Sequence, residues 1–269
     1  MGHRRDLVIV KLGGSVITDK LHVKKPNSSA INRLAEEMGS AFKQGVKLII
    51  VHGGGSYGHP YAAKYELQKG YVHEGQLLGF AETRLAMEEL NRMVVEALLR
   101  HGLPSIAVQP SACIVAENGE IKHFFTSPIE TLLKIDCVPV LYGDVVVDLE
   151  KGFTVISGDK IISYLALHLG AKRVVFGCDV DGIYTSNPRF NSQAELIRKL
   201  KLDEAIRMLK CGVFEQRVID VTGGMKAKLL EAIKMVSSGC EVLIVNAMKP
   251  DRLRRAVLGE EVIGTRIIQ

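Results

Sequence analysis

The sequence lacks the features of a secreted, membrane-spanning or disulfide-stabilised protein. Its five cysteines are odd in number, widely spaced and without a Cys-X-X-Cys pair, which predicts reduced thiols rather than a disulfide or zinc framework. The apolar run near the start covers only Leu7 to Val10, too short for the core of a signal peptide. No other run approaches the roughly 20 apolar residues of a membrane-spanning helix. We therefore expect a cytoplasmic location and no membrane partner.

The chain is also short of aromatic residues and of strong net charge. Aromatic residues make up 6% of it, and the formal net charge of +5 comes from Lys and Arg that are spread along the chain. A basic track with interleaved aromatic rings, as in nucleic-acid binders, is therefore absent. A mild positive charge favours a small anionic substrate instead. Because 47% of the 269 residues are hydrophobic, the chain can bury a substantial core.

Strands and helices are expected to alternate along the chain. The β-rich runs 7–12 and 46–51 flank a segment whose apolar residues recur at helical spacing from Ser28 to the closing Gly45. Such a unit predicts parallel strands joined by a right-handed crossover. The same alternation continues to the end of the chain, so we predict an α/β fold: a three-layer αβα sandwich with a central, mostly parallel sheet. Further strands are expected over 105–108, 113–115, 138–141, 153–156, 172–177, 241–245 and 264–268, and helices over 80–100, 161–169 and 227–237. The turn signal at residues 117–120 predicts a hairpin through Asn118-Gly119 that returns over 121–125.

The sequence contains no long linker and no repeat of fixed period. One continuous domain over residues 1–269 with two functional halves fits this best. We place the division near residue 155, with residues 1–155 expected to bind the phosphoryl acceptor and residues 156–269 expected to bind the nucleotide.

Two glycine turns follow the first two predicted strands. Gly13-Gly14 follows the first strand, and Gly53-Gly54-Gly55 follows the second. Glycine lets the backbone approach a ligand closely, and the exposed N–H groups form a cradle for anions. Both turns lie at carboxyl ends of strands, where α/β folds bind their ligands. We expect the segment after Val51, from His52 through His59, to be irregular because of its glycine content.

Three charged positions point to phosphate chemistry. Lys11 lies in an apolar strand, where a lysine costs free energy unless it has an anionic partner. Asp159 lies in the first turn of a predicted helix, where it either caps the helix or orients a catalytic lysine. Lys226 follows two glycines at the start of the predicted helix 227–237, and a helix N-terminus favours phosphate. The loop 178–188 has too few oxygen ligands for calcium and suits the edge of a nucleotide.

The segment from Gln76 to Met87 is more apolar than one buried helix face requires. It is either ordinary core or the wall of a hydrophobic substrate pocket beside the second glycine turn.

Five motifs in this order resemble the amino acid kinase superfamily over nearly the whole chain. They are Lys11-Leu12-Gly13-Gly14-Ser15, His52 to Gly55, Ser157-Gly158-Asp159-Lys160, Cys178 to Tyr184, and Thr222-Gly223-Gly224-Met225-Lys226. Within that superfamily, the extension from Gly55 to Pro60 resembles the isopentenyl phosphate kinase family, which has a histidine at the place of His59. Fosfomycin kinases share that histidine and form the alternative. A non-catalytic nucleotide-sensing module of the same fold is a second alternative.

The resemblance implies transfer of the γ-phosphoryl group of ATP to isopentenyl phosphate, giving isopentenyl diphosphate and ADP. It also implies a homodimer and Mg²⁺ that enters with ATP, held mainly by phosphates and water. A phosphomonoester is mostly dianionic at pH 7, so the nucleophile needs no general base. The reaction needs positioning and charge stabilisation instead.

The resemblance also implies a role for individual residues. Lys11 matches the lysine that contacts the transferred phosphoryl group, and Lys20 matches the proposed stabiliser of the transition state. His59 matches the residue that hydrogen-bonds the acceptor phosphate, and Asp159 the carboxylate that organises the lysines. The remaining matches are Gly13, Gly14 and Ser15 at the ATP phosphates, Gly54 and Gly55 between donor and acceptor phosphates, Gly158 on the substrate side, and Asp179, Tyr184, Gly223 and Lys226 at the nucleotide. His52 is expected to orient the glycine turn.

Overall fold

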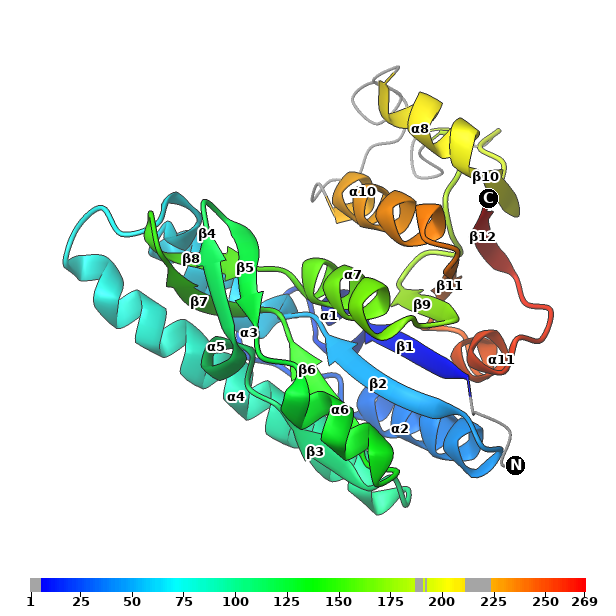
Figure 1. Cartoon of the computed structure of the whole chain (residues 1–269), viewed down its shortest axis with the longest axis horizontal. Coiled ribbons are helices and arrows are strands. Elements are labelled where there is room, and N and C mark those ends of the chain that lie inside the picture. The colour runs from blue at the N-terminus through cyan, green and yellow to red at the C-terminus, as the bar shows by residue number, and fades with distance from the viewer. Residues whose placement is uncertain (1–5, 187–190, 192, 211–223) are drawn as a thin grey trace.

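The computed structural model describes residues 6–186, 191, 193–210 and 224–269 (Figure 1). A central sheet of eight strands runs in the order β10-β12-β11-β9-β1-β2-β6-β3. Every pairing in it is parallel except that of β11 with β12. The strands are β1 (Leu7–Leu12), β2 (Lys47–His52), β3 (Ser105–Ala107), β6 (Val138–Tyr142), β9 (Arg173–Cys178), β10 (Lys199–Lys201), β11 (Glu241–Asn246) and β12 (Gly264–Ile268).

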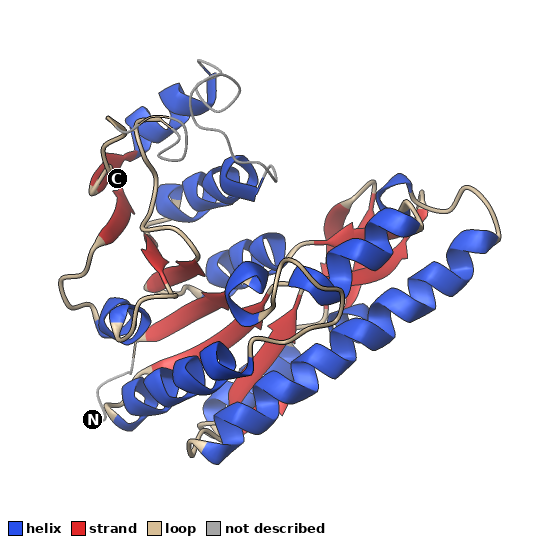
Figure 2. Ribbon diagram, turned by 180° about the vertical axis from the view of Figure 1, so that it is seen from behind, coloured by secondary structure: helices blue, strands red, loops and turns tan. Residues whose placement is uncertain are grey.

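Helices cover both faces of this sheet. Side chains that alternate along β1 enter two different cores, with Val8 and Val10 on one face and Ile9 on the other. The Val8 face packs on α2 (Ser28–Lys43), α4 (Gly75–Arg100) and α11 (Arg252–Leu258), and Figure 2 shows α2 and α4 lying across it. The Ile9 face packs on α6 (Ser127–Lys134), α7 (Gly158–Leu169), α8 (Leu202–Lys210) and α10 (Gly224–Ser237). The predicted three-layer αβα sandwich is confirmed.

A second, four-stranded sheet in the order β5-β4-β7-β8 extends from one end of the central sheet (Figure 1). Its hairpin turn at Asn118-Gly119 was predicted, and both residues adopt positive φ, as such turns require. The buried carboxylate of Asp148 accepts hydrogen bonds from both of their N–H groups, at 3.1 and 2.7 Å. The strands are β4 (Ile114–Glu117), β5 (Glu120–Phe124), β7 (Asp144–Asp148) and β8 (Gly152–Ile156). The predicted strand over 113–115 is wrong at its start, because α5 (Pro110–Cys113) precedes β4.

The expectation that residues 52–59 are irregular holds for Gly53 and Gly54 but is wrong for His52, which ends β2, and for the residues from Gly55 onward, which are helical. Helix α3 (Gly55–Lys64) begins at the last glycine of the turn and contains Pro60. Proline has no N–H to offer the carbonyl of Ser56, four residues earlier. That carbonyl accepts a hydrogen bond from the backbone N–H of Lys24 instead, at 3.0 Å. A contact from outside the helix therefore satisfies the group that proline leaves unpaired.

The central sheet is continuous from β3 to β10. The division into an acceptor-binding half and a nucleotide-binding half near residue 155 stays a prediction. Within the described ranges, no helix combines the length and the apolar character needed to cross a membrane.

Candidate active site

The carboxyl ends of three neighbouring strands carry the predicted glycine turns. Leu12, the last residue of β1, is in register with His52 of β2 and Gly177 of β9. The N–H of Gly13 donates to the carbonyl of Gly177 at 2.9 Å, and the N–H of Gly53 donates to that of Leu12 at 3.0 Å. The two turns are therefore fixed to the sheet and lie side by side, as the strand order predicts.

The backbones of the two turns touch. A Cβ atom placed on Gly14 would lie 2.4 Å from the nitrogen of Gly55, and one placed on Gly53 would lie 2.8 Å from the nitrogen of Gly14. Any side chain at these positions would push the turns apart. Gly55 also has φ +47°, a left-handed conformation that favours glycine. The glycines thus serve both the close approach of the turns and the conformation of the chain.

A buried charge centre lies beside these turns. Lys11 Nζ donates to Asp159 Oδ1, and Lys228 Nζ donates to Asp159 Oδ2 at 3.1 Å. All three side chains are about 90% shielded from solvent. The ring of Phe176 lies under Lys228, with its centroid 4.7 Å from Nζ. Two cations and one anion leave a net charge of +1 in this centre, which suits an incoming phosphoryl group.

The surroundings fix the protonation of this centre. Burial alone would raise the pKa of Asp159, but the charges and hydrogen bonds of Lys11 and Lys228 lower it to about 2. Asp159 is therefore ionised at neutral pH. Burial, with the charge on Lys228, lowers the pKa of Lys11, while Asp159 opposes that shift.

Lys20 belongs to a second, more open ion pair. Its Nζ donates to Asp179 Oδ2 at 2.6 Å, and Ser15 Oγ donates to the other oxygen of Asp179 at 3.1 Å. The Lys20 side chain is 52% exposed. The expectation was that Asp159 organises the lysines; the structure brings Lys11 and Lys228 to Asp159 but places Lys20 against Asp179.

His59 and Gly158 approach the centre from two helix N-termini. His59 lies one turn into α3 and is exposed, yet partial burial of its ring and the charge of Lys11 lower its pKa. A Cβ placed on Gly158, the first residue of α7, would lie 3.6 Å from Lys11 Cε. The positive ends of two helices and a neutral imidazole are thus added to the positive charge of the centre.

The structure describes some, but not all, of the residues that were predicted to bind the nucleotide. The Tyr184 hydroxyl has a raised pKa because of burial and of nearby Asp181, which pairs with Arg252 at 2.6 Å. Tyr184 and Asp181 lie in the segment after β9, at the same edge of the sheet as Asp179. Gly223 lies outside the described residues. Lys226 lies two residues before Lys228 on α10, and residues two apart on a helix point to different sides.

Lys228 is the site residue that the sequence interpretation missed. It shares the apolar face of α10 with the buried residues Leu229, Ala232 and Met235. A lysine on an apolar helix face requires an anionic partner, for the same reason that Lys11 does in its strand. That signal is present in the sequence, two residues after Lys226, which lies nearer the glycines.

The apolar segment 76–87 divides between the core and the surface. Met87 is buried, and its Sδ lies 3.1 Å from where a Cβ on Gly54 would be. Leu77, Leu78 and Leu85 are exposed and do not form a continuous wall. Met87 is thus in contact range of the second glycine turn.

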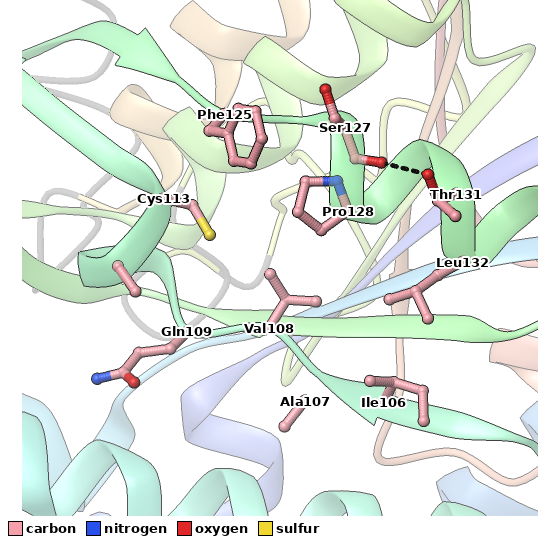
Figure 3. Close-up of a pocket in the computed structure, with 11 residues that line it drawn as sticks. Ile106, Ala107, Val108, Gln109, Cys113, Phe125, Ser127, Pro128, Thr131 and Leu132 are labelled. Carbon is pink, nitrogen blue, oxygen red and sulfur yellow. Dashed lines mark hydrogen bonds between the residues drawn. The ribbon is translucent and has the colours of Figure 1, made fainter.

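An apolar groove of about 590 Å³ lies away from this centre, at the edge strand β3. Figure 3 shows Val108, Phe125, Pro128 and Leu132 around it. Phe125 is 64% exposed. No charged residue lines the groove, so it is unsuited to a phosphate.

Comparison with known proteins identifies the family. The model of the amino acid kinase family matches residues 6–246. The chain belongs to the amino acid kinase family. It is 42% identical to an isopentenyl phosphate kinase of Methanothermobacter thermautotrophicus, with 97% of this chain and 98% of that protein covered. It is 35% identical, with the same coverage, to an isopentenyl phosphate kinase of Methanocaldococcus jannaschii. A crystal structure of an isopentenyl phosphate kinase matches with a TM-score of 0.84 and 40% identity, covering 97% of this chain and 99% of that one.

His52 has a structural place beneath the glycine turn. It is fully buried at the end of β2, stacks on Tyr142 at 5.4 Å, and has Nε2 3.1 Å from Asn91 Oδ1 and Nδ1 3.2 Å from the Gly53 carbonyl. Burial lowers its pKa to about 4. The ring is therefore neutral at pH 7 and supports the turn without adding charge.

This environment predicts a loss of stability in acid. The unfolded chain binds a proton at His52 below pH 6.5, whereas the folded chain resists it down to about pH 4. Stability should therefore fall as the pH drops from 6.5 to 4, by about 3 kcal/mol from this residue. In His52→Gln, urea unfolding at pH 7 and pH 4.5 should show a smaller difference between the two pH values than in the wild type. An unchanged difference would contradict this prediction.

The two lysines of α10 can be separated by mutation. Lys228→Met should lower the kcat of phosphoryl transfer about 100-fold, because it removes a charge fixed at the reaction centre. Lys226→Met is the matched variant and should act mainly on the KM for ATP. Steady-state kinetics measure both, and thermal unfolding checks that Lys228→Met is folded. Equal losses of kcat in the two variants would contradict the prediction that Lys228, and not Lys226, supplies the charge fixed at the reaction centre.

Proposed function

We propose that the protein is an ATP-dependent kinase that phosphorylates isopentenyl phosphate to isopentenyl diphosphate. The observation that carries this is the position of His59, one turn into the helix that begins at the second glycine turn, where burial and the charge of Lys11 lower its pKa. A histidine beside the reaction centre suits a phosphate acceptor rather than a carboxylate. The two relatives named isopentenyl phosphate kinase, at 42% and 35% identity over nearly the full chain, support the same acceptor. The fosfomycin-kinase and nucleotide-sensing alternatives are not favoured.

The centre performs the transfer by charge and position, without a general base. The acceptor phosphate is already a nucleophile at pH 7, because its second pKa is near 6. Asp159, with a pKa of about 2 and two lysine partners, is not available to take a proton. Its role is to hold Lys11 and Lys228 at the place where the transferred group carries its charge.

The remaining groups align the two phosphates. The N–H groups of Gly14 and Ser15 cradle the donor, and those of Gly54 and Gly55 separate donor from acceptor, while the N–H groups of Gly13 and Gly53 hold the turns to the sheet. His59 donates a hydrogen bond to the acceptor from its neutral ring. Lys20 lies at the outer side, where it can stabilise charge that develops during transfer.

ATP is the donor that the kinase family implies, and we propose that it binds as its magnesium complex. The carboxylates near the turns are already occupied, Asp159 by two lysines and Asp179 by Lys20 and Ser15. In the described residues there is no group of three His, Cys, Asp or Glu that could ligate a metal. The phosphates of ATP and water would therefore be the main ligands of Mg²⁺, as is usual for this ion.

Met87 is the residue that we assign to the hydrocarbon end of the acceptor. It is buried against Gly54 and Gly58, on the α4 side of the second turn, so it would shape the floor on which a tail leaving the acceptor phosphate lies. A flexible thioether suits an irregular apolar contact.

We also propose that the protein is a cytoplasmic homodimer. Leu78, Leu85 and Leu99 lie seven and fourteen residues apart on α4 and are 61%, 65% and 52% exposed. The spacing places them on one face of α4. A second copy would cover this apolar face. The widely spaced cysteines favour the reducing cytoplasm.

The acceptor is tested by measuring ADP release with Mg-ATP and a panel of isopentenyl phosphate, dimethylallyl phosphate, fosfomycin, acetylglutamate and UMP. We expect the highest kcat/KM with isopentenyl phosphate. His59→Ala should raise the acceptor KM and cost about 1.5–3 kcal/mol in kcat/KM, because it removes a hydrogen bond to a charged group. His101→Ala, at the far end of α4, is the control. Release of ADP with fosfomycin alone would contradict the proposed acceptor, and unchanged kinetics in His59→Ala would remove His59 from the site.

The dimer is tested by light scattering after size exclusion. The wild type should elute with the mass of two chains, and Leu85→Asp should shift the mass toward one chain because it buries a charge in the interface. Ile263→Asp, at an exposed apolar position near the opposite end of the sheet, is the matched control and should stay dimeric. A wild type with the mass of a single chain would reject the proposal.

A further inference from the structure

Thr18 joins the two glycine turns through its side chain. It is 97% buried and follows α1 (Gly14–Ile17), the short helix that begins at the first turn. Its Oγ1 donates a hydrogen bond to the carbonyl of Gly14 at 2.7 Å and accepts one from the N–H of Ser56 at 3.0 Å. Gly14 belongs to the donor turn and Ser56 to the first turn of α3. One hydroxyl therefore bonds to both sides of the site.

The space around this hydroxyl allows little displacement. A Cβ placed on Gly55 would lie 2.1 Å from Thr18 Oγ1 and 2.6 Å from the carbonyl of Gly14. The glycine is therefore needed for the hydroxyl to reach Ser56. Since the turns also touch through their backbones, a change at Thr18 is transmitted to both of them.

The neighbours of Thr18 in the chain are the groups assigned to the reaction. His59 follows Ser56 by three residues, so the two lie on one side of α3. Lys20 follows Thr18 by two residues, in a segment that is tied to α3 by the bond from Lys24 N–H to the Ser56 carbonyl and by that from Ser56 Oγ to the Lys25 carbonyl. Thr18 is thus the point where the donor turn, the acceptor helix and the Lys20 segment meet.

We propose that Thr18 is a positioning residue for phosphoryl transfer. Its hydroxyl sets the separation between the donor turn at Gly14 and the helix that carries His59, and so the separation between the two phosphates. The proposal rests on the proposed function. It concerns alignment rather than affinity, because Thr18 is buried and its hydroxyl already donates to the Gly14 carbonyl and accepts from the Ser56 N–H. Its loss should therefore lower kcat more than it raises either KM.

A purely structural role is the competing explanation. A threonine hydroxyl that bonds to the carbonyl four residues earlier is common at helix ends. Such a role would cost stability, and would leave the kcat of the folded fraction unchanged. The bond from Ser56 N–H is what separates the two explanations, because it contributes nothing to α1.

The test compares Thr18→Val, which keeps the shape and loses the hydroxyl, with Thr18→Ser, which keeps the hydroxyl. We expect Thr18→Val to lower kcat about 10- to 100-fold, since small misplacements of reacting groups have effects of this size. Both KM values should change less than threefold, and Thr18→Ser should return kcat to within threefold of the wild type. If valine is not accommodated, Thr18→Ala removes the hydroxyl without adding bulk.

A double variant of Thr18 and His59 separates the two explanations, because a purely structural role of Thr18 predicts that the losses of kcat multiply. If Thr18 acts by placing α3, the loss of kcat in Thr18→Val combined with His59→Ala should be smaller than the product of the two single losses. Multiplicative losses, or a kcat within twofold of the wild type in folded Thr18→Val, would overturn the proposal.

Hydrogen exchange keeps this test separate from the identity of the acceptor. The Ser56 amide should exchange at least tenfold faster in Thr18→Val than in Thr18→Ser, while amides of α2 keep their protection. This measurement needs no substrate. Faster exchange with no turnover of isopentenyl phosphate in the wild type would reject the proposed function, and the kcat comparison would then use the acceptor that the panel identifies. Unchanged exchange at Ser56 would reject the inference about Thr18.

Discussion

Asp159 holds two lysines together inside the protein, where they would otherwise repel each other. Without the carboxylate, Lys11 and Lys228 would be two like charges, each largely removed from water, and burial would drive them toward the neutral form. With it, each lysine has an anionic partner that holds it in place, and for Lys11 the carboxylate opposes the lowering of the pKa by burial. The strands and helices that meet here are β1, α7 and α10, so this one interaction joins the first part of the chain to two later parts.

The contact between the glycine turns depends on the same arrangement of strands. Parallel strands β2, β1 and β9 bring three chain segments to one edge, and only glycine lets Gly14 and Gly55 approach as closely as they do. A phosphate donor and a phosphate acceptor must come within bonding distance despite their charges. A backbone wall without side chains allows this approach, and the lysines nearby offset the repulsion.

Much of the fold could be predicted from local patterns. The alternation of strands and helices was sufficient for the three-layer sandwich, and Asn118-Gly119 was sufficient for the hairpin. The start of α3 could not be predicted from glycine content, because the helix depends on a hydrogen bond from Lys24 to the carbonyl that Pro60 leaves unpaired. That bond joins residues more than thirty positions apart in the sequence, and no local pattern contains it.

The candidate site, like the fold, could be predicted only in part. Lys11 could be recognised because a lysine in an apolar strand needs a partner, and Lys228 met the same condition on a helix face. Which carboxylate each lysine would meet could not be predicted from the local sequence, because Asp159 follows β8 of the small sheet and Asp179 follows β9 of the central sheet, and only the folded chain sets their distances from each lysine. Their assignment depends on the separation of β1, α7 and α10 in space.

The two ion pairs of the site differ in burial, and this difference gives them different uses. Breaking the pairing of Lys11 or Lys228 with Asp159 would leave an uncompensated charge in the interior, which costs several kcal/mol, typically about 3–5. The pair of Lys20 with Asp179 is half exposed, and pairs of this kind contribute about 0–1 kcal/mol. Lys20 can therefore leave Asp179 for a charge that develops during transfer at little cost, while the buried lysines stay in place throughout. The fixed cations Lys11 and Lys228 thus suit the charge that the phosphates already carry on binding. Lys20, which can exchange its partner, suits the charge that forms only in the transition state.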